Sequence, residues 1–363
     1  MNFIKEVWIH IRGKEAIMGN IIKQPRWKKV EYSRNQIIKA GKTLRKVNAS
    51  DEEKNRAILV IDNWRAAHAF PLHIIYVHLR RFSGNNGVIV AERLKRLDSI
   101  VNKLKREQNM NLWTMQDLGG CRVIVPTLDD VYKYANQYEH SRKRHLKKKE
   151  YDYIKYPKSS GYRCLHIVYE YHSDKHQDYN NNMLIEIQFR THLQHLWATA
   201  VETMGLFTNQ AIKAGKGSPD IKRFFVLVSS LFAIEENTPI VPNTSSDMDE
   251  LIHEVESLNA ANHYLDFLTS IKVAIKMEED PVSNGYCVMT LNYEINQLTI
   301  KRFNSSEIEQ ANNYYTALES KRTSEKTDTV LVRVSSFSEL KSAYPNYFSD
   351  ISEFVARVKE YLN

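Results

Sequence analysis

The sequence lacks the features that mark secreted or membrane-spanning proteins. Its 363 residues include only three cysteines, Cys121, Cys164 and Cys287, which are far apart and form neither a metal-binding spacing nor an even disulfide set. No apolar run approaches the roughly 20 residues that a bilayer-spanning helix needs. The first 19 residues mix charged and aromatic side chains and have no signal-peptide core. We therefore expect a cytoplasmic protein that makes no membrane contact.

Acidic residues are scarce in the first part of the chain. Residues 1–150 contain 31 Lys and Arg against 15 Asp and Glu, whereas residues 151–363 contain 20 against 28. This asymmetry indicates a basic front half that meets phosphates and a back half that does not. A solvated basic surface would give the same numbers, so charge alone leaves both explanations open.

The patterning along the chain predicts a mixed α/β (α+β) protein without internal repeats. Apolar, β-branched runs predict buried strands at 121–126, 165–171 and 183–190, and periodic segments predict helices at 128–140, 193–206 and 220–235. We also expect a helix over 51–81 with a break at Pro71, a linker at 238–248 and one long helix from Asp249 to Met277. A ββαβα unit should follow, with elements at 286–293, 297–302, 307–321, 329–334 and 349–362.

A basic helix is the first candidate binding element. Positions 95, 99, 103 and 106 are spaced so that Lys95, Ser99, Lys103 and Arg106 share one helical face. A row of cations of this kind can hold a polyphosphate. A solvated helix face is the alternative.

Asp117 stands at the start of a buried strand, just before Gly119 and Gly120, which allow the backbone to approach a ligand closely. A carboxylate in such a place can bind a magnesium ion that bridges a polyphosphate. The alternative is an Asp that caps a helix or a turn.

Two further segments carry polar residues in a suggestive pattern. In the loop over 153–166, Tyr162 precedes a strand and can stack on a nucleobase, or it is an ordinary surface tyrosine. Glu186, Gln188 and Arg190 alternate with apolar residues and share one face of a strand. That row is either solvent-facing or, if covered, needs a metal or a cation beside the Glu.

Taken together and in this order, these segments resemble the RelA/SpoT alarmone synthetase family over about Val88 to Gly205. The matching motifs are Asp117…Arg122, Gly161-Tyr162…His166…Glu186-x-Gln188-x-Arg190-Thr191 and the helix from His195 to Glu202. The resemblance implies a nucleotidyltransferase-like mixed sheet flanked by helices.

The resemblance also implies a reaction and the residues that perform it. A ribose 3′-hydroxyl attacks the β-phosphorus of ATP, with Mg²⁺ as cofactor. Asp117 and Glu186 are then the catalytic and metal-binding residues, and Tyr162 stacks on the acceptor base. The ATP and phosphate ligands would be Arg93, Lys95, Ser99, Lys103, Arg122, Lys158, His166, Gln188 and Arg190.

One departure from the family pattern concerns the acceptor. Alarmone synthetases usually have a lysine directly before Asp-Tyr-Ile, where this chain has Tyr151 before Asp152-Tyr153-Ile154. Clustered lysines and arginines lie just upstream and favour a larger polyanion. We therefore expect the acceptor end of a tRNA, bound by Lys28, Lys29, Arg142, Lys143, Arg144, Lys147, Lys148 and Lys149. A (p)ppGpp or (p)ppApp synthetase acting on free nucleotides is the alternative, and a degenerate fold that only binds RNA is a third.

The second departure is the segment that follows the family region. The whole chain resembles toxic small synthetases fused to their own antitoxin, the CapRel type. That resemblance implies a toxin that blocks translation, a C-terminal part that inhibits it through Tyr344 and Tyr347, and release by a phage protein such as a capsid protein. The alternative is that both tyrosines pack into the C-terminal core. The expected domains are a basic helical region (1–85), the synthetase core (86–237), a linker with the long helix (238–283) and an antitoxin-like α/β unit (284–363).

Overall fold

The computed structural model describes residues 27–83, 87–208, 217–277, 283–320, 327–348 and 350–363. The first part of the expected basic region and most of the expected loop at 210–218 lie outside these ranges. Among the described residues, no helix is both long and apolar enough to cross a membrane.

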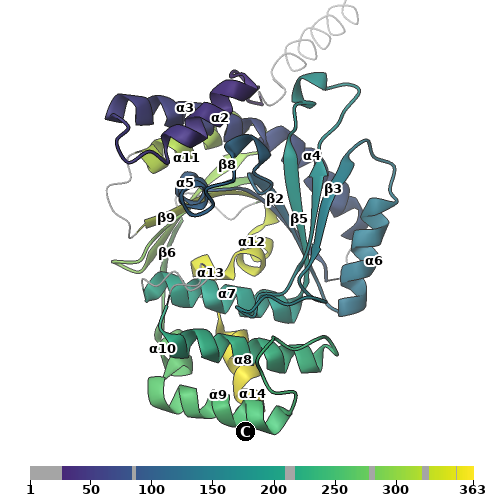
Figure 1. The fold of residues 1–363 in the computed structure, drawn as a ribbon, viewed down its shortest axis with the longest axis vertical. Helices are drawn as coiled ribbons and strands as arrows, with labels where there is room; N and C mark the ends of the chain where they lie inside the picture. Colours follow the sequence, from purple (N-terminus) through teal and green to yellow (C-terminus); the bar gives the residue numbers. More distant parts are fainter. Residues whose placement is uncertain (1–26, 84–86, 209–216, 278–282, 321–326, 349) are drawn as a thin grey trace, which may run out of the picture.

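One mixed sheet runs through the whole molecule (Figure 1). Its strands are ordered β3-β4-β5-β2-β1-β9-β7-β8-β6. The pairs β2–β5 and β6–β8 are parallel and the other neighbours are antiparallel. The strands are β1 (Ile89–Leu94), β2 (Gly119–Val125), β3 (Leu146–Asp152), β4 (Leu165–Glu170), β5 (Leu184–Thr191), β6 (Ala274–Met277), β7 (Ser283–Asn292), β8 (Gln297–Asn304) and β9 (Thr327–Ser336). The mixed α/β class is therefore confirmed.

Helices cover both faces of this sheet. They are α2 (Arg34–Thr43), α3 (Asp51–Ala67), α4 (Ala69–Ser83), α5 (Leu97–Arg106), α6 (Leu128–Glu139), α7 (His192–Phe207), α8 (Pro219–Glu235), α9 (Met248–Asn262), α10 (Tyr264–Ser270), α11 (Ile308–Ser320), α12 (Phe337–Ala343), α13 (Pro345–Phe348) and α14 (Ser352–Leu362), with short 3₁₀ turns at Leu112–Thr114 and Gln177–Tyr179. The predicted start of α3 is confirmed, because Ser50 and Glu53 form a reciprocal capping box there.

Three predicted elements are wrong in detail. The basic helix begins only at Leu97, so Lys95 precedes α5 and does not lie on its face. The expected long helix ends at Asn262, where His263 adopts a left-handed conformation (φ 54°), and after α10 the chain becomes strand β6. The break in the first helical segment falls at His68 rather than at Pro71. Pro71 lies in the first turn of α4, where a missing N–H costs nothing.

The two faces of the strands β4, β5, β2 and β1 differ sharply. One face is apolar and packs on α4 and α6 through residues such as Val123, Ile167 and Ile187. The other face is concave and carries the polar side chains of the candidate site. Figure 1 shows α12 and α13 inside this concavity, with α7 running along its lower rim.

The C-terminal elements extend the same sheet. Strand β9 pairs with β1 through Glu92–Arg333 and Arg93–Val332. Helices α12 and α13 pack on β7, β8 and β9, in a core that also includes Ala91 of β1. The order β7-β8-α11-β9 follows the expected ββαβ pattern, but α14 leaves this unit.

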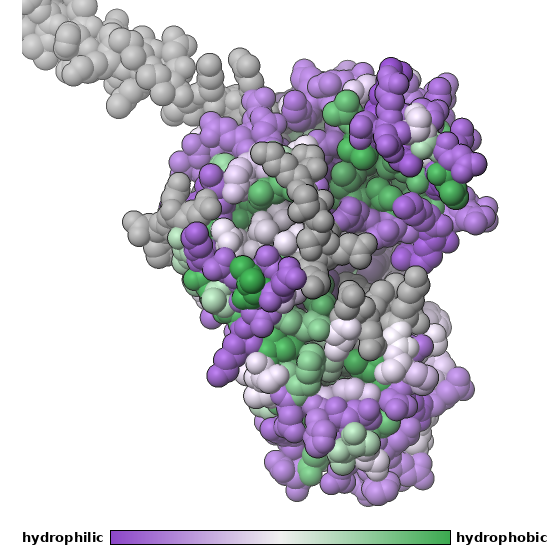
Figure 2. Space-filling model, turned by 90° about the vertical axis from the view of Figure 1, so that its left-hand side faces the viewer, coloured by the Kyte–Doolittle hydropathy of each residue, from purple (hydrophilic) through white to green (hydrophobic). Residues whose placement is uncertain are grey.

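Helix α14 packs on α7, α8, α9 and α10, with Phe354 and Val358 fully buried among them. These helices form the lower end of the molecule, and Figure 2 shows mainly hydrophilic side chains over their outer surface. The last helix of the chain is therefore anchored to the helices that follow β5.

Candidate functional site

A pocket opens on the concave face where β1, β2 and β5 run side by side. The strand register sets Gly120 opposite both Arg93 and Glu186, and Arg122 beside Gln188. Residues far apart in the sequence thus meet at one place. The pocket is lined by Ala91, Arg93, Lys95, Asp117, Gly120, Cys121, Arg122, Glu186, Gln188 and Tyr344.

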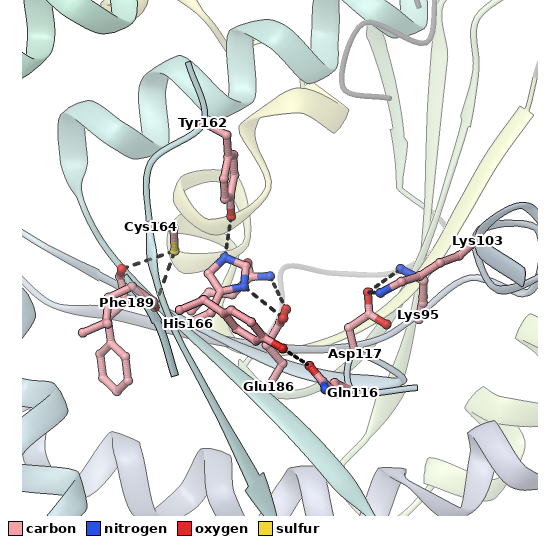
Figure 3. A network of polar contacts seen from close by, with 12 residues as sticks. Lys95, Lys103, Gln116, Asp117, Tyr162, Cys164, His166, Glu186 and Phe189 are labelled. Carbon is pink, nitrogen blue, oxygen red and sulfur yellow. Dashed lines mark hydrogen bonds and ion pairs between the residues drawn. The ribbon is translucent and has the colours of Figure 1, made fainter. Parts of the chain in front are cut away.

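Asp117 lies just before β2 and is held by two lysines. Its Oδ2 accepts hydrogen bonds from Lys95 Nζ at 2.8 Å and from Lys103 Nζ at 3.0 Å, as Figure 3 shows. Burial opposes ionisation of the carboxyl group, but the two ammonium groups outweigh it and lower the pKa of Asp117 to about 2. Asp117 is therefore a carboxylate throughout the physiological pH range.

Glu186 is part of a second hydrogen-bonded group, separate from the first in Figure 3. Its Oε1 accepts from His166 Nδ1 at 2.9 Å, and its Oε2 accepts from Gln188 Nε2 at 2.7 Å. His166 Nε2 lies 2.8 Å from the hydroxyl of Tyr162. The predicted residues Tyr162, His166, Glu186 and Gln188 thus form one chain of contacts.

The charged forms of His166 and Glu186 stabilise each other. Burial disfavours the charged form of both groups. Their mutual attraction outweighs burial in Glu186 and lowers its pKa, while Tyr162, Cys164 and Glu186 together hold the pKa of His166 well above its ordinary value. The imidazolium form donates Nδ1–H to Glu186 and Nε2–H to the Tyr162 hydroxyl.

The two carboxylates fit a magnesium ion that phosphates help to coordinate. Asp117 Oδ1 is buried and has no hydrogen-bond partner among the described residues. Glu186 is near enough for the charge of Asp117 to oppose its ionisation, although the pKa of Glu186 remains lowered by His166. In the described ranges no three His, Cys, Asp or Glu side chains gather as ligands. Because Mg²⁺ is commonly held by one or two carboxylates plus substrate phosphates, this donor set is sufficient.

The arginines on this face are tied to neighbouring elements. Arg122 donates to the carbonyl oxygen of Ala343 at 2.8 Å, and its guanidinium lies 5.7 Å from the ring centre of Tyr344. Arg190 is buried at the end of the row that carries Glu186 and Gln188, and it donates to His195 Nδ1 on α7.

His195 received no role from the sequence. Burial, followed by repulsion from Arg190, lowers the pKa of this imidazole well below its ordinary value. The neutral ring accepts from Arg190 and donates Nε2–H to the carbonyl oxygen of Ser342 at 2.9 Å. The sequence signal for His195 was its position in the first turn of the helix that follows the Glu186 strand. A side chain in that turn lies beside Arg190, which ends the polar row of Glu186 and Gln188.

The pocket lining does not include five of the predicted phosphate ligands: Ser99, Lys103, Lys158, His166 and Arg190. Ser99 is half-buried on α5. Lys158 is exposed, and its Nζ lies 4.1 Å from the ring centre of Tyr153 and 5.4 Å from that of Tyr162. Lys158 therefore belongs to the aromatic side of the site.

Six of the eight predicted RNA-binding cations, from Arg142 to Lys149, lie on or just before the edge strand β3, whereas Lys28 and Lys29 precede α2. Several have acidic partners: Lys147 contacts Glu139 and Glu150, both at 2.7 Å, Lys148 contacts Glu170 at 3.0 Å, and Arg144 contacts Asp174 at 2.9 Å. Lys143 donates to the carbonyl oxygen of Tyr138 at 2.7 Å, while Arg142 and Lys149 are exposed. Lys29 pairs with Asp178 at 2.7 Å, and the carbonyl oxygen of Lys28 accepts from Tyr179 at 3.1 Å.

The two tail tyrosines have different surroundings. Tyr344 lines the pocket, and its hydroxyl donates to the carbonyl oxygen of Glu92 at 3.1 Å. Tyr347 is 1 % exposed, and its hydroxyl donates to Asp328 Oδ2 at 2.9 Å. Asp328 forms an ion pair with Arg96. Both tyrosines are thus buried in the C-terminal core, and of the two Tyr344 is the one that also lines the pocket.

Two ionised carboxylates among clustered cations define a site for polyphosphate and a divalent cation. Comparison with known proteins agrees with this class: residues 92–210 match the family described as "Region found in RelA / SpoT proteins". All the pocket-lining residues from Arg93 to Gln188 fall inside this region.

Two curated relatives from Bacillus subtilis (strain 168) match part of the chain. GTP pyrophosphokinase YjbM is 33% identical over 117 residues, which is 30% of this chain and 52% of the relative. GTP pyrophosphokinase YwaC is 34% identical over 116 residues, again 30% and 52%. The chain thus spans about half the length of the curated relatives it matches.

Solved structures with partial similarity include two proteins of this kind. Small alarmone synthetase 1 from Bacillus subtilis, bound to its product pppGpp, gives a TM-score of 0.38 at 23% identity and covers 52% of this chain and 94% of its own. A GTP pyrophosphokinase family protein from Streptococcus pneumoniae gives 0.39 at 24% identity, covering 53% and 93%.

Proposed function

We propose that this protein is an ATP-dependent pyrophosphokinase that transfers pyrophosphate to the 3′-hydroxyl at the acceptor end of tRNA. The observation that carries the proposal is the meeting of Asp117 and Glu186 with Arg93, Lys95 and Arg122 in one pocket of a RelA/SpoT region.

Each residue has a role that follows from its surroundings. Arg93, Lys95 and Arg122 line the pocket and offset the charge of the donor triphosphate. Glu186 is ionised and accepts the proton of the attacking hydroxyl, while His166 fixes its orientation. The hydroxyl oxygen bonds to the β-phosphorus of ATP, the bond to the α-phosphate oxygen breaks, and AMP leaves. Asp117 and Glu186 would hold Mg²⁺, which supplies charge stabilisation on the transferred group.

The choice of tRNA rests on Tyr151 and the basic edge strand. Tyr151 stands where alarmone synthetases usually have a lysine, and β3 presents exposed cations beside it. Synthesis of (p)ppGpp or (p)ppApp on free nucleotides is the second candidate, favoured by the names of the two relatives.

We further propose that the C-terminal elements inhibit the site. Tyr344 lines the pocket. The carbonyl oxygen of Ala343 accepts a hydrogen bond from Arg122, and that of Ser342 accepts one from His195. The carbonyl of Ala343 thus competes with a bound triphosphate for the Arg122 cation. Release would follow when a phage protein, for example a capsid protein, binds the C-terminal elements, and the outcome would be a translation-blocking toxin for phage defence.

Transfer of label from γ-labelled ATP tests both parts. Full-length protein and Tyr344→Ala are incubated with bulk tRNA, GDP, GTP and ATP as acceptors, with Asp117→Asn as the inactive control. We expect weak labelling of tRNA by the wild type and strong labelling by Tyr344→Ala. Label on free nucleotides but not on tRNA would reject the tRNA assignment, and equal rates for the two proteins would reject inhibition by the tail.

A further inference from the structure

An aromatic surface adjoins the pocket on the side of Glu186. It is formed by Tyr151, Tyr153, Tyr162 and Lys158. The rings of Tyr151 and Tyr153 are parallel, with centres 5.9 Å apart and an interplanar angle of 4°. The edge-to-face contacts of Tyr153 are with Tyr162 at 6.1 Å and with His166 at 5.3 Å.

This surface leads from the carboxylate to the basic edge of the sheet. The register sets Tyr151 opposite His166 and Lys149 opposite Val168, which is itself opposite Glu186. Because paired residues of neighbouring strands point to the same face, Tyr151 and Lys149 lie on the face that carries Glu186. Tyr151 is half-buried, its hydroxyl lies 3.4 Å from Gln116 Oε1, and Lys149 is exposed.

Parallel rings flanked by cations are suited to single-stranded nucleic acid, since every base offers a π-face to an aromatic side chain. One base of an acceptor is already assigned to Tyr162. The Tyr151–Tyr153 pair would be superfluous for a mononucleotide acceptor, which has no second base.

We propose that Tyr151 and Tyr153 form a second base-stacking subsite, which binds the nucleotide preceding the acceptor nucleotide in a single-stranded RNA 3′ end. Lys149 lies on the same face and offsets the charge of the connecting phosphates. The proposal rests on the proposed function in taking an RNA 3′ end as the acceptor, and it names Tyr151 as a residue that distinguishes RNA from a free nucleotide.

Binding of a labelled single-stranded tetraribonucleotide to the full-length protein tests the subsite without requiring catalysis. Fluorescence anisotropy is measured without ATP, both in the wild type and in a Tyr344→Ala background. Loss of one stacked base should weaken binding by roughly 5- to 150-fold in Tyr151→Ala, whereas Tyr151→Phe should bind as the wild type does. Tyr156→Ala is the matched control, because the ring of Tyr156 is 77% exposed on the following turn.

Salt dependence separates stacking from charge. Tyr151→Ala should leave the slope of log affinity against log salt unchanged, whereas Lys149→Gln should reduce the slope by about 0.7. A thermal melt of each variant confirms that it is folded. Unchanged affinity in Tyr151→Ala, or an equal loss in Tyr156→Ala, would overturn the subsite.

Failure of the subsite and failure of the proposed function give different results. Tyr151-dependent binding without any label transfer would contradict the pyrophosphokinase assignment and leave the subsite standing. Label transfer to tRNA at the same rate in the wild type and in Tyr151→Ala would support the pyrophosphokinase assignment and contradict the subsite.

Discussion

Asp117 illustrates how a few side chains set the chemistry of this pocket. Its carboxylate is flanked by two ammonium groups, and one of its oxygens has no partner in the described structure. The two lysines keep Asp117 ionised. Its other carboxylate oxygen, Oδ1, lacks a partner among the described residues, so a cation beside it would be stabilised. A single residue thus joins the basic helix α5 to the start of β2.

The acid stability of the protein should reflect this arrangement. The pKa of Asp117 is lowered to about 2 in the folded state, so its contribution is complete above the unfolded value near 4 and is lost as the pH falls towards 2. We expect wild type to lose about 2 kcal/mol more unfolding free energy between pH 5 and pH 2 than Asp117→Asn. Urea unfolding at several pH values measures this, with Asp129→Asn as an exposed control. Parallel pH profiles for wild type and Asp117→Asn would contradict it.

A second residue-scale prediction concerns His166. Its folded pKa is raised, so the ring should remain protonated at pH 7.5 and lose its proton, together with its stabilising effect, only as the pH rises further. Nitrogen chemical shifts of the labelled imidazole report this state directly. In Glu186→Gln the attraction is gone, and the titration midpoint should fall. An imidazole of His166 that is neutral at pH 7.5 in the wild type would contradict the charged pair.

At the scale of elements, local signals explain what the sequence predicted and what it did not. Strands β2, β4 and β5 are apolar and β-branched, and they were recognised. Strand β3 was not predicted. It begins Leu-Lys-Lys-Lys-Glu and is exposed along most of its length. Because it is an edge strand, its residues need not alternate between apolar and polar. The end of α9 carries neither Gly nor Pro, so nothing in the sequence marked the turn at His263.

The sequence predicted most of the residues that the structure places around the candidate pocket, and their roles stay predictions. The motif residues carry chemistry that is visible one by one, so Asp117, Glu186 and their cations were found. The carbonyls of Ser342 and Ala343 were not found, because backbone carbonyls leave no mark in a sequence, and His195 received no role although its position was a signal. The position of Tyr344 against Arg122 depends on contacts between segments more than 200 residues apart.

Helix α14 provides an element-scale prediction. Phe354 is fully buried against α7 and α8, so Phe354→Ala should lower the free energy of unfolding by about 3–5 kcal/mol. Glu353→Ala is the matched control, because that side chain is 62% exposed. Urea unfolding compares the two, and a similar small loss in both would show that α14 contributes little to the core.

At the scale of the whole molecule, the C-terminal elements and the part that carries the site bury surface against each other. A chain ending near Asp249 would lack β9 beside β1 and would expose the faces of α7 and α8 that pack on α9, α10 and α14. We therefore expect residues 27–247 alone to aggregate, and residues 248–363 supplied in trans to restore solubility. Size-exclusion chromatography measures this, and a monodisperse, stable fragment would contradict it.

The junction of β1 and β9 has one further consequence. Only two residue pairs connect these strands, whereas β7 and β9 are paired along most of their length. Separating β1 from β9 would leave the edge of β1 without a partner strand and would also break the hydrogen bonds that join Tyr344 to Glu92 and Arg122 to Ala343. A protein that binds the C-terminal strands would therefore act on this short junction to move Tyr344 away from the pocket.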